Sequence, residues 1–217
     1  MRISENIEED YMDEIDARRS ALLITSILDR LEIKYWFDYG ALLGTVRNHK
    51  FIPWDTDIEI NFKYVSEEQI NNLIHYLKSY YSIDSKKKDY YLHIEPKQGL
   101  VGMSLSWFPE NTFTKVLGFI CYHLPTKVRM GIIKLVQEIY CKSTNETIRP
   151  DDGEDREQSW HCRAIRQMLP IFFCYKTRPE KLYDMEVMVP EKAEELLYLR
   201  YGKEWRIPMK KYRSYTT

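Results

Sequence analysis

The sequence lacks an apolar run long enough to cross a membrane, since none reaches the roughly 18 residues that a spanning helix needs. It also lacks a basic excess, because 32 lysines and arginines face 33 acidic residues, for a net charge of −1. This balance argues against nucleic-acid binding, which requires a basic surface to neutralise phosphates. The acidic N-terminal stretch MRISENIEEDYMDEID has no apolar segment typical of a secretory signal, so we expect a cytoplasmic protein.

Paired cysteines are missing as well: there are four cysteines, and none forms a C-x-x-C pair. In a protein without a secretory signal, reduced thiols are the simplest interpretation. A zinc site is the open alternative, although its spacing would match no standard zinc finger. Its candidate ligands are Cys121, His123, His161, Cys162 and Cys174.

The 217 residues suggest one domain with a sizeable core, and 44% hydrophobic and 30% charged residues are typical of a globular protein. Apolar spacing predicts helices over residues 8–31, 66–81, 115–140 and 191–201, the second starting at a capping box at Ser66 and the third broken at Pro125. Gly40 permits a turn before a shorter helix that begins at Ala41. Strands are predicted at 35–37, 51–62, 90–94 and 101–108, so the class is α/β or α+β.

The stretch FIPWDTDIEI, residues 51–60, carries acids at every second position: Asp55, Asp57 and Glu59. In a strand this alternation turns the acids to one face, while Ile58 and Ile60 face the core. Three carboxylates so close together repel one another unless a cation neutralises them, and Mg²⁺ suits such oxygen ligands. The alternative for this motif alone is an exposed edge strand with solvated acids.

The residues before the acids favour the cation site. Gly40 precedes a short helix, where a phosphate can approach backbone amides, and Arg47 and Lys50 offer positive charge between that glycine and Asp55. A glycine, basic side chains and an acidic strand together suit nucleotidyl or phosphoryl transfer, in which positioning and charge neutralisation provide most of the catalysis.

Two segments resemble the LicD/fukutin family. YGALLGTVRNHKFIPWDTDIEI, residues 39–60, is similar to the family run G-T-L-L-G…R…I-P-W-D-x-D-x-D. VMVPEKAEELLYLRYGKEWRIP, residues 187–208, resembles the family ending V-P-x-x-x-E-x-x-L-x-x-x-Y-G-x-x-W-x-x-P. The matching residues of the first segment are Gly40, Leu42, Leu43, Gly44, Arg47, Ile52, Pro53, Trp54, Asp55, Asp57 and Ile58. Those of the second are Val189, Pro190, Leu197, Tyr201, Gly202, Trp205 and Pro208.

The resemblance implies a nucleotidyltransferase-like fold, with a small mixed sheet flanked by helices and a helical C-terminal half. It implies an enzyme that uses Mg²⁺ (or Mn²⁺) to transfer phosphocholine or a polyol phosphate from a CDP-linked donor to a hydroxyl of a glycan or glycolipid. Residues 1–217 would form a single LicD-like domain. Its catalytic core would span 32–110, and its helical part would span 115–217 with a mobile loop near 142–158.

The resemblance also implies roles for individual residues. Asp55, Asp57 and Glu59 would hold the metal. The donor would be bound by Gly40, Ala41, Gly44, Arg47 and Lys50. Asp55 and Asp57 would be catalytic together with a base on a later strand.

The sequence departs from the family pattern in three places. Ala41 replaces a threonine, and Glu59 is a longer third acid. The base depends on the alignment: LHIEP makes it Glu95, which we prefer, whereas SLSWFP puts Ser106 there, which cannot act as that base.

Two other functions stay open. Asp-x-Asp also holds the metal of a sugar nucleotide in glycosyltransferases, and a non-catalytic glycan- or nucleotide-binding module could keep the same fold. Separately, residues 115–140 mix apolar and basic side chains (Lys127, Arg129, Lys134). A partly buried helix is the interpretation we prefer, and peripheral contact with a membrane is the alternative.

Overall fold

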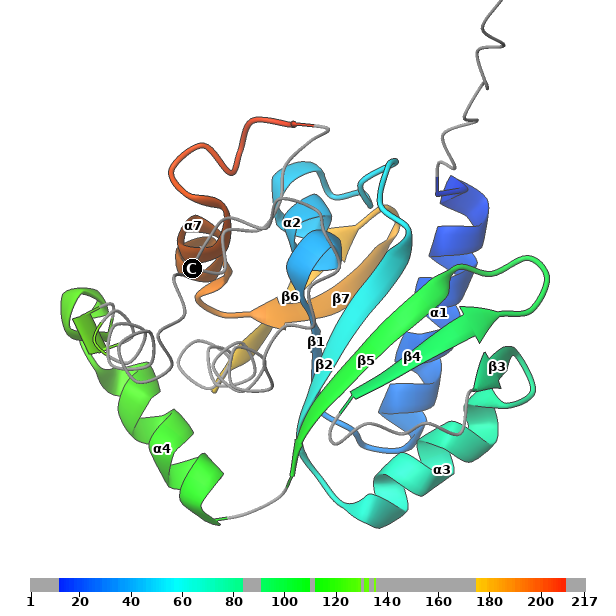
Figure 1. Ribbon diagram of the computed structural model, residues 1–217, viewed down its shortest axis with the longest axis horizontal. Coiled ribbons are helices and arrows are strands. Elements are labelled where there is room, and N and C mark those ends of the chain that lie inside the picture. The colour runs from blue at the N-terminus through cyan, green and yellow to red at the C-terminus, as the bar shows by residue number, and fades with distance from the viewer. Residues whose placement is uncertain are drawn as a thin grey trace, which may run out of the picture.

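The computed structural model describes residues 12–83, 91–109, 112–129, 131–132, 135 and 175–209 (Figure 1). The predicted loop near 142–158, the end of the predicted helix 115–140 and the start of the helix at 8–11 lie outside these residues. Within the described part, no helix has both the length and the apolar character needed to cross a membrane.

A five-stranded sheet forms the centre of the fold, in the order β1-β2-β5-β4-β3. Its strands are β1 Tyr35–Phe37, β2 Asp57–Val65, β3 Tyr81–Ile83, β4 Tyr91–Pro96 and β5 Gly102–Pro109. β2 and β5 run parallel, whereas the other neighbouring pairs are antiparallel. This mixed sheet with flanking helices confirms the predicted α+β class.

The described residues include the helices α1 Glu14–Arg30, α2 Tyr39–Asn48, α3 Glu67–Leu77, α4 Thr112–His123 and α7 Ala193–Tyr201. α1 begins at Asp13, whose carboxylate accepts the amide of Asp16. α3 begins at the predicted capping box, in which Ser66 and Gln69 satisfy each other's backbone amides. α4 ends at His123, shortly before Pro125, as expected of a residue that cannot continue a helix.

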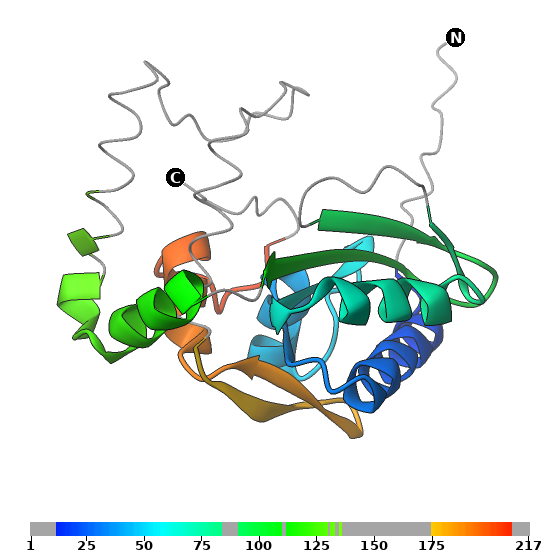
Figure 2. The same cartoon turned by 90° about the horizontal axis from the view of Figure 1, so that it is seen from below.

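The two faces of the sheet have different chemistry. Ile58, Ile60 and Phe62 of β2 are fully buried in the larger core, together with apolar residues of α1 and α3. These two helices lie against that face, as the blue and teal ribbons of Figure 2 show. Asp57 and Glu59, which alternate with these residues, point to the other face and are only partly buried. The alternation therefore separates the core from the candidate site.

The C-terminal part contains a hairpin that we did not predict, β6 Thr177–Leu182 and β7 Met185–Pro190. At its turn, Tyr183 has a left-handed backbone (φ 55°) and its amide donates to the carbonyl of His49 at 2.7 Å. The hairpin thus holds the end of α2. α7 follows, and its leucines pack with Trp36 and Leu42 in a second core.

Two local predictions need correction. Gly40 is the second residue of α2 and does not form a turn before it. β2 begins only at Asp57, so Asp55 precedes the strand, in a turn where its amide donates to the carbonyl of Ile52 at 3.1 Å. The reason for the second difference is that residues 53 and 54 turn the chain before it can pair with β5.

Candidate active site

Three carboxylates converge where β2 begins. Asp55 reaches the cluster from the preceding turn, and Asp57 and Glu59 project from the polar face of β2. One oxygen of each lies within 4.8 Å of the others. Among the described residues, they are the one group of three or more metal-ligating side chains close enough to share an ion.

Burial and mutual repulsion change the acidity of this cluster. Burial, and then the charge of Asp57, raise the pKa of Asp55 from 3.8 to about 6. Burial, followed by Asp55 and Asp57, raises the pKa of Glu59 well above its usual value. Partly buried acids with only oxygen donors and no balancing cation within the cluster fit a hard divalent ion such as Mg²⁺ or Mn²⁺.

The first turn of α2 supports two of these acids. The amide of Ala41 donates to Glu59 Oε2 at 3.1 Å. A Cβ on Gly40 would lie 1.9 Å from Asp55 Oδ2, so only glycine leaves space for that carboxylate. The amide of Ala41, which we expected near a donor phosphate, therefore serves a protein carboxylate.

A cavity of about 300 Å³ opens beside α2. Asp55 and Glu59 form one wall, and Arg47 of α2 adds a positive charge. Burial lowers the pKa of Arg47 from its usual value, and Tyr201 partly opposes that effect. The other lining residues are Tyr39, Gly40, Leu43, Ile52, Trp54, Tyr201 and Met209. We call this the arginine cavity.

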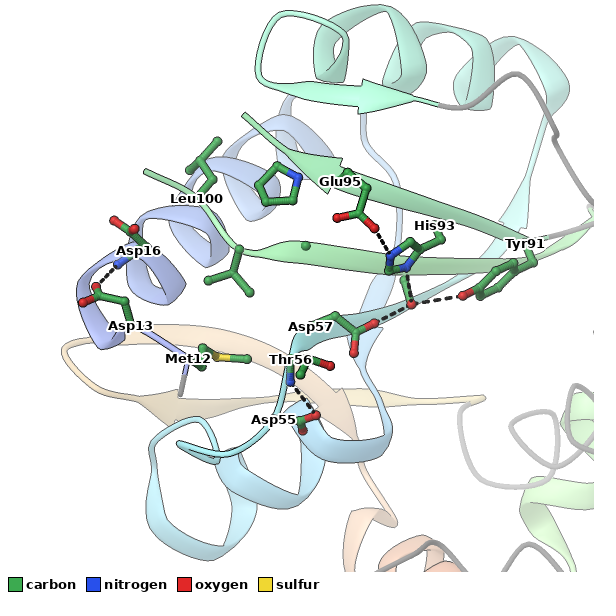
Figure 3. A pocket seen from close by; sticks show the side chains of 14 residues that line it. Met12, Asp13, Asp16, Asp55, Thr56, Asp57, Tyr91, His93, Glu95 and Leu100 are labelled. Atoms are coloured by element: carbon green, nitrogen blue, oxygen red, sulfur yellow. Dashed lines mark hydrogen bonds and ion pairs between the residues drawn. The ribbon is translucent and has the colours of Figure 1, made fainter. Parts of the chain in front are cut away.

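A second cavity of about 600 Å³ is also lined by Asp55 (Figure 3). Asp57 and Glu95 line it, and a chain of hydrogen bonds joins them. Ser104 Oγ donates to Asp57, His93 Nδ1 lies 3.1 Å from Ser104 Oγ, and His93 Nε2 lies 2.9 Å from Glu95 Oε1. Five carboxylates border this space: Asp13, Asp16, Asp55, Asp57 and Glu95. We call it the acidic cavity.

The competing positions for the base differ in their surroundings. Glu95 of β4 is a wall of the acidic cavity, and its side chain is 70% exposed. Ser106 of β5 pairs with Asn61 and Tyr91, two residues beyond Ser104 along the same strand. Glu95 is thus linked to Asp57 through His93 and Ser104.

Two expected donor-binding residues have other surroundings. A Cβ on Gly44 would lie 2.4 Å from the carbonyl oxygen of Lys50, so this glycine lets the following loop pack closely on α2. The ammonium of Lys50 lies 3.9 Å from Glu14 and 6.0 Å from the ring centre of Tyr183. Neither Gly44 nor Lys50 lines the arginine cavity, whereas Gly40 and Arg47 do.

The alternative zinc site gains no support among the described residues. Cys121 is a free, buried thiol at the end of α4, and its pKa is raised by burial. Of its suggested partners, His161, Cys162 and Cys174 lie outside the described residues.

Sequence analysis missed several residues around the site. His93 and Ser104 lie on the same faces of their strands as Glu95 and Ser106, and the period of two could have found them. Asp38 and Arg200 form a buried ion pair beside the start of α2, and no local pattern reveals a pair 162 residues apart.

Comparison with known proteins finds similarity in the segment that carries this site. Residues 32–123 match the family model described as LicD/FKTN/FKRP, nucleotidyltransferase domain. The resemblance seen in the sequence is thereby confirmed over these residues, which make up less than half of the chain.

Individual relatives match over shorter segments. The ribitol 5-phosphate transferase FKRP of Mus musculus and that of Homo sapiens are each 35% identical over 43 residues, which is 20% of this chain and 9% of FKRP. An uncharacterized protein of Rickettsia typhi is 27% identical over 97 residues, 40% of this chain and 31% of that protein. The chain therefore spans less than a third of these curated relatives.

Proposed function

We propose that this protein transfers a phospho-alcohol, such as phosphocholine or a polyol phosphate, from a CDP-linked donor to a glycan hydroxyl, using a divalent cation. The observation that carries the proposal is the convergence of Asp55, Asp57 and Glu59 beside two cavities, of which one contains an arginine and the other is lined by five carboxylates. The family match and the similarity to a ribitol 5-phosphate transferase support the same class of reaction.

The two cavities suggest which substrate each one takes. A diphosphate suits the arginine cavity, because Arg47 adds positive charge beside the acids. Aromatic side chains of Tyr39, Trp54 and Tyr201 surround that space and offer surfaces for a base or a ribose. The acidic cavity would repel phosphate but can accept hydrogen bonds from sugar hydroxyls, so we assign the acceptor there.

The chemistry of transfer then follows from these positions. Asp55, Asp57 and Glu59 would hold Mg²⁺, which neutralises charge on the donor's diphosphate when bound. Glu95 takes the proton of the acceptor hydroxyl, and the hydroxyl oxygen attacks the phosphorus that carries the alcohol. A new P–O bond forms, the bond to the bridging oxygen breaks, and CMP leaves with that electron pair.

The products test this proposal. We would incubate the protein and Mg²⁺ with CDP-choline, CDP-ribitol or CDP-glycerol, and in parallel with UDP-sugars, together with a panel of glycan acceptors. The expected result in ³¹P NMR is a new phosphodiester signal together with CMP. Acceptor-dependent release of UDP without that signal would identify a glycosyltransferase instead. Binding without turnover of any donor would identify a binding module.

A further inference from the structure

A buried ion pair connects the C-terminal helix to the candidate site. Arg200 of α7 donates through both terminal nitrogens to Asp38, and the two side chains are fully buried. Asn61 of β2 donates to the same carboxylate. Burial by itself lowers the pKa of Arg200, but Asp38 and Tyr39 raise it above the usual value, so the guanidinium stays charged.

Such a pair is a poor source of stability. Removing two charges from water costs several kcal/mol per ion, and their attraction often does no more than offset that cost. A bidentate arginine fork, however, fixes the orientation of its carboxylate. The ion pair therefore matters more for the position of Asp38, and of the residues that Asp38 contacts, than for stability.

Asp38 is the residue from which α2 starts. Its amide donates to the carbonyl of Glu59 at 3.0 Å, and its carbonyl accepts the amide of Leu42 at 3.0 Å. The next residue, Tyr39, has a left-handed backbone (φ 43°), which is costly for a residue with a bulky side chain. The guanidinium of Arg200 lies 4.0 Å from the centre of the Tyr39 ring, and this cation–π contact stabilises the strained residue.

The contacts of α2 with the acids follow immediately in the chain. Gly40 gives Asp55 its space, and the amide of Ala41 binds Glu59. Tyr39 itself is a wall of the arginine cavity. A shift of the Asp38–Tyr39 backbone would move all three contacts at once, because helical residues move as a unit.

We propose that Arg200 is a positioning residue: through Asp38 and Tyr39 it sets the start of α2 and thereby the geometry of the Asp55–Asp57–Glu59 cation site. The inference rests on the proposed metal dependence. It makes the tail of the chain part of the site without any contact between Arg200 and the substrates.

Cation affinity tests this role without knowledge of the substrates. Arg200→Lys keeps the charge but loses the fork and the flat stacking surface. Asp38→Asn combined with Arg200→Met removes the pair without leaving an unpaired buried charge. Mn²⁺ binding would be measured by calorimetry well below the melting temperature, and thermal melts without metal would report folding. Arg206→Lys is the control, since Arg206 pairs with Glu194 on the surface of the same tail.

We expect the Arg200→Lys variant and the double variant, if folded, to bind Mn²⁺ with an affinity lower by about tenfold or more. Losses of this size are typical when a residue that orients the metal ligands is removed. Arg206→Lys should bind as the wild type does. Wild-type affinity in either folded Arg200 variant would overturn the inference. So would failure of both variants to fold, because it would assign the pair a purely structural role. If the wild type binds no cation, the proposed metal site fails first, and this inference fails with it.

Discussion

The two glycines of α2 face different neighbours, and their substitutions should have different effects. Beside Gly40 stands the end of a side chain, Asp55, which can rotate away at little cost to the fold. Beside Gly44 stands the backbone of residues 50–52, which cannot give way without moving the loop. Gly40 is therefore needed for the geometry of the site, whereas Gly44 is needed for the stability of the fold.

Gly40→Ala should leave the melting temperature within a few degrees of wild type but weaken Mn²⁺ binding by about tenfold or more, because Asp55 is displaced. Gly44→Ala should destabilise the protein by about 1–3 kcal/mol, the usual cost of overpacking, and keep the cation affinity of the remaining folded protein. Calorimetry and thermal melts of both variants measure these effects. The reverse pattern would contradict our account of α2.

Asp57 accepts a hydrogen bond from Ser104 and has an oxygen within 4.8 Å of one oxygen each of Asp55 and Glu59, so we expect cation binding to depend on its charge. We expect Asp57→Asn to lower transferase activity by at least about a hundredfold, since even partners behind a metal ligand typically cost 10–100-fold. The fold should persist, with slightly raised stability in the absence of metal, because a repulsion is relieved. Glu186→Gln, at an exposed position of β7, is the control. Full activity of Asp57→Asn, or undiminished wild-type activity in EDTA, would reject the assignment.

Strand register assembles the polar face of the site from separate parts of the chain. Ser104 of β5 is the register partner of Glu59 on one side and of His93 on the other, so three strands contribute one row. Glu95 follows His93 at the next position of the same face. The candidate base is thus placed by β4, and the cation ligands mainly by β2.

Separate substitutions of Glu95 on β4 and Ser106 on β5 should distinguish the two alignments of the base. Glu95→Gln should lower kcat by about 10²–10⁴-fold with little change in KM for the donor, since general-base catalysis contributes about that much. Ser106→Ala should retain nearly full activity. Steady-state kinetics with the best CDP-alcohol would measure both. Equal activity of Glu95→Gln and wild type would leave the protein without a dedicated base on β4.

Each of the two hydrophobic cores contains residues from the N-terminal and the C-terminal parts of the chain, and the smaller core depends on both. Trp36, Leu42 and Leu43 come from the front, whereas Val189, Leu196 and Leu197 come from the tail. A family-matched segment that ends at residue 123 would therefore expose one side of α2. It would also leave Asp38 buried without Arg200.

A fragment that ends at residue 175 lacks β6, β7 and α7, and we expect it to show no cooperative thermal unfolding. The reason is that it loses half of the smaller core and the countercharge of Asp38. Circular dichroism melts of the fragment and the full chain measure this. A cooperative melt of the fragment would show that the front folds alone, contrary to a single domain over residues 1–217.

The acid cluster should make the stability of the whole molecule depend on pH. In the absence of a cation, the pKa of Asp55 is about 6 in the folded protein and 3.8 in the unfolded chain. The folded state thus binds this proton more tightly, and the resulting stabilisation is complete below about pH 3.8 and lost as the pH rises through 6.

We therefore expect the metal-free wild type to lose about 1 kcal/mol more stability between pH 5 and pH 7.5 than Asp55→Asn does, or about 2–4 °C in melting temperature. Mg²⁺ should restore stability at pH 7.5 and have less effect at pH 5, where protons compete for the ligands. Calorimetric scans of both proteins with and without Mg²⁺ provide the test. Identical pH slopes for wild type and Asp55→Asn would contradict the raised pKa.

Local patterns predicted those elements whose signals lie within a few residues. The capping box at Ser66, the alternation from Asp57 to Phe62 and the glycine after Tyr201 all appear at or within a residue of their expected positions. The hairpin β6–β7 escaped prediction because its turn uses Tyr183 in a left-handed conformation instead of Gly or Asn, and because Pro179, a residue that disfavours strands, lies within β6. β3 escaped because it follows α3 almost directly and has only three residues.

The amino-acid order alone determined that three carboxylates would be neighbours near a glycine-containing helix, because the spacing of side chains along a strand is a local property. Only the tertiary structure decided what surrounds them. Parallel pairing with β5 brought Ser104 to Asp57, antiparallel pairing with β4 brought Glu95 to the same cavity, and the packing of α7 brought Arg200 to Asp38. The contacts of Ser104 with Asp57 and of Arg200 with Asp38 join residues 47 and 162 positions apart, and the place of Glu95 comes from strand order. No local pattern encodes these contacts or the strand order, because they depend on how the whole chain buries its apolar faces.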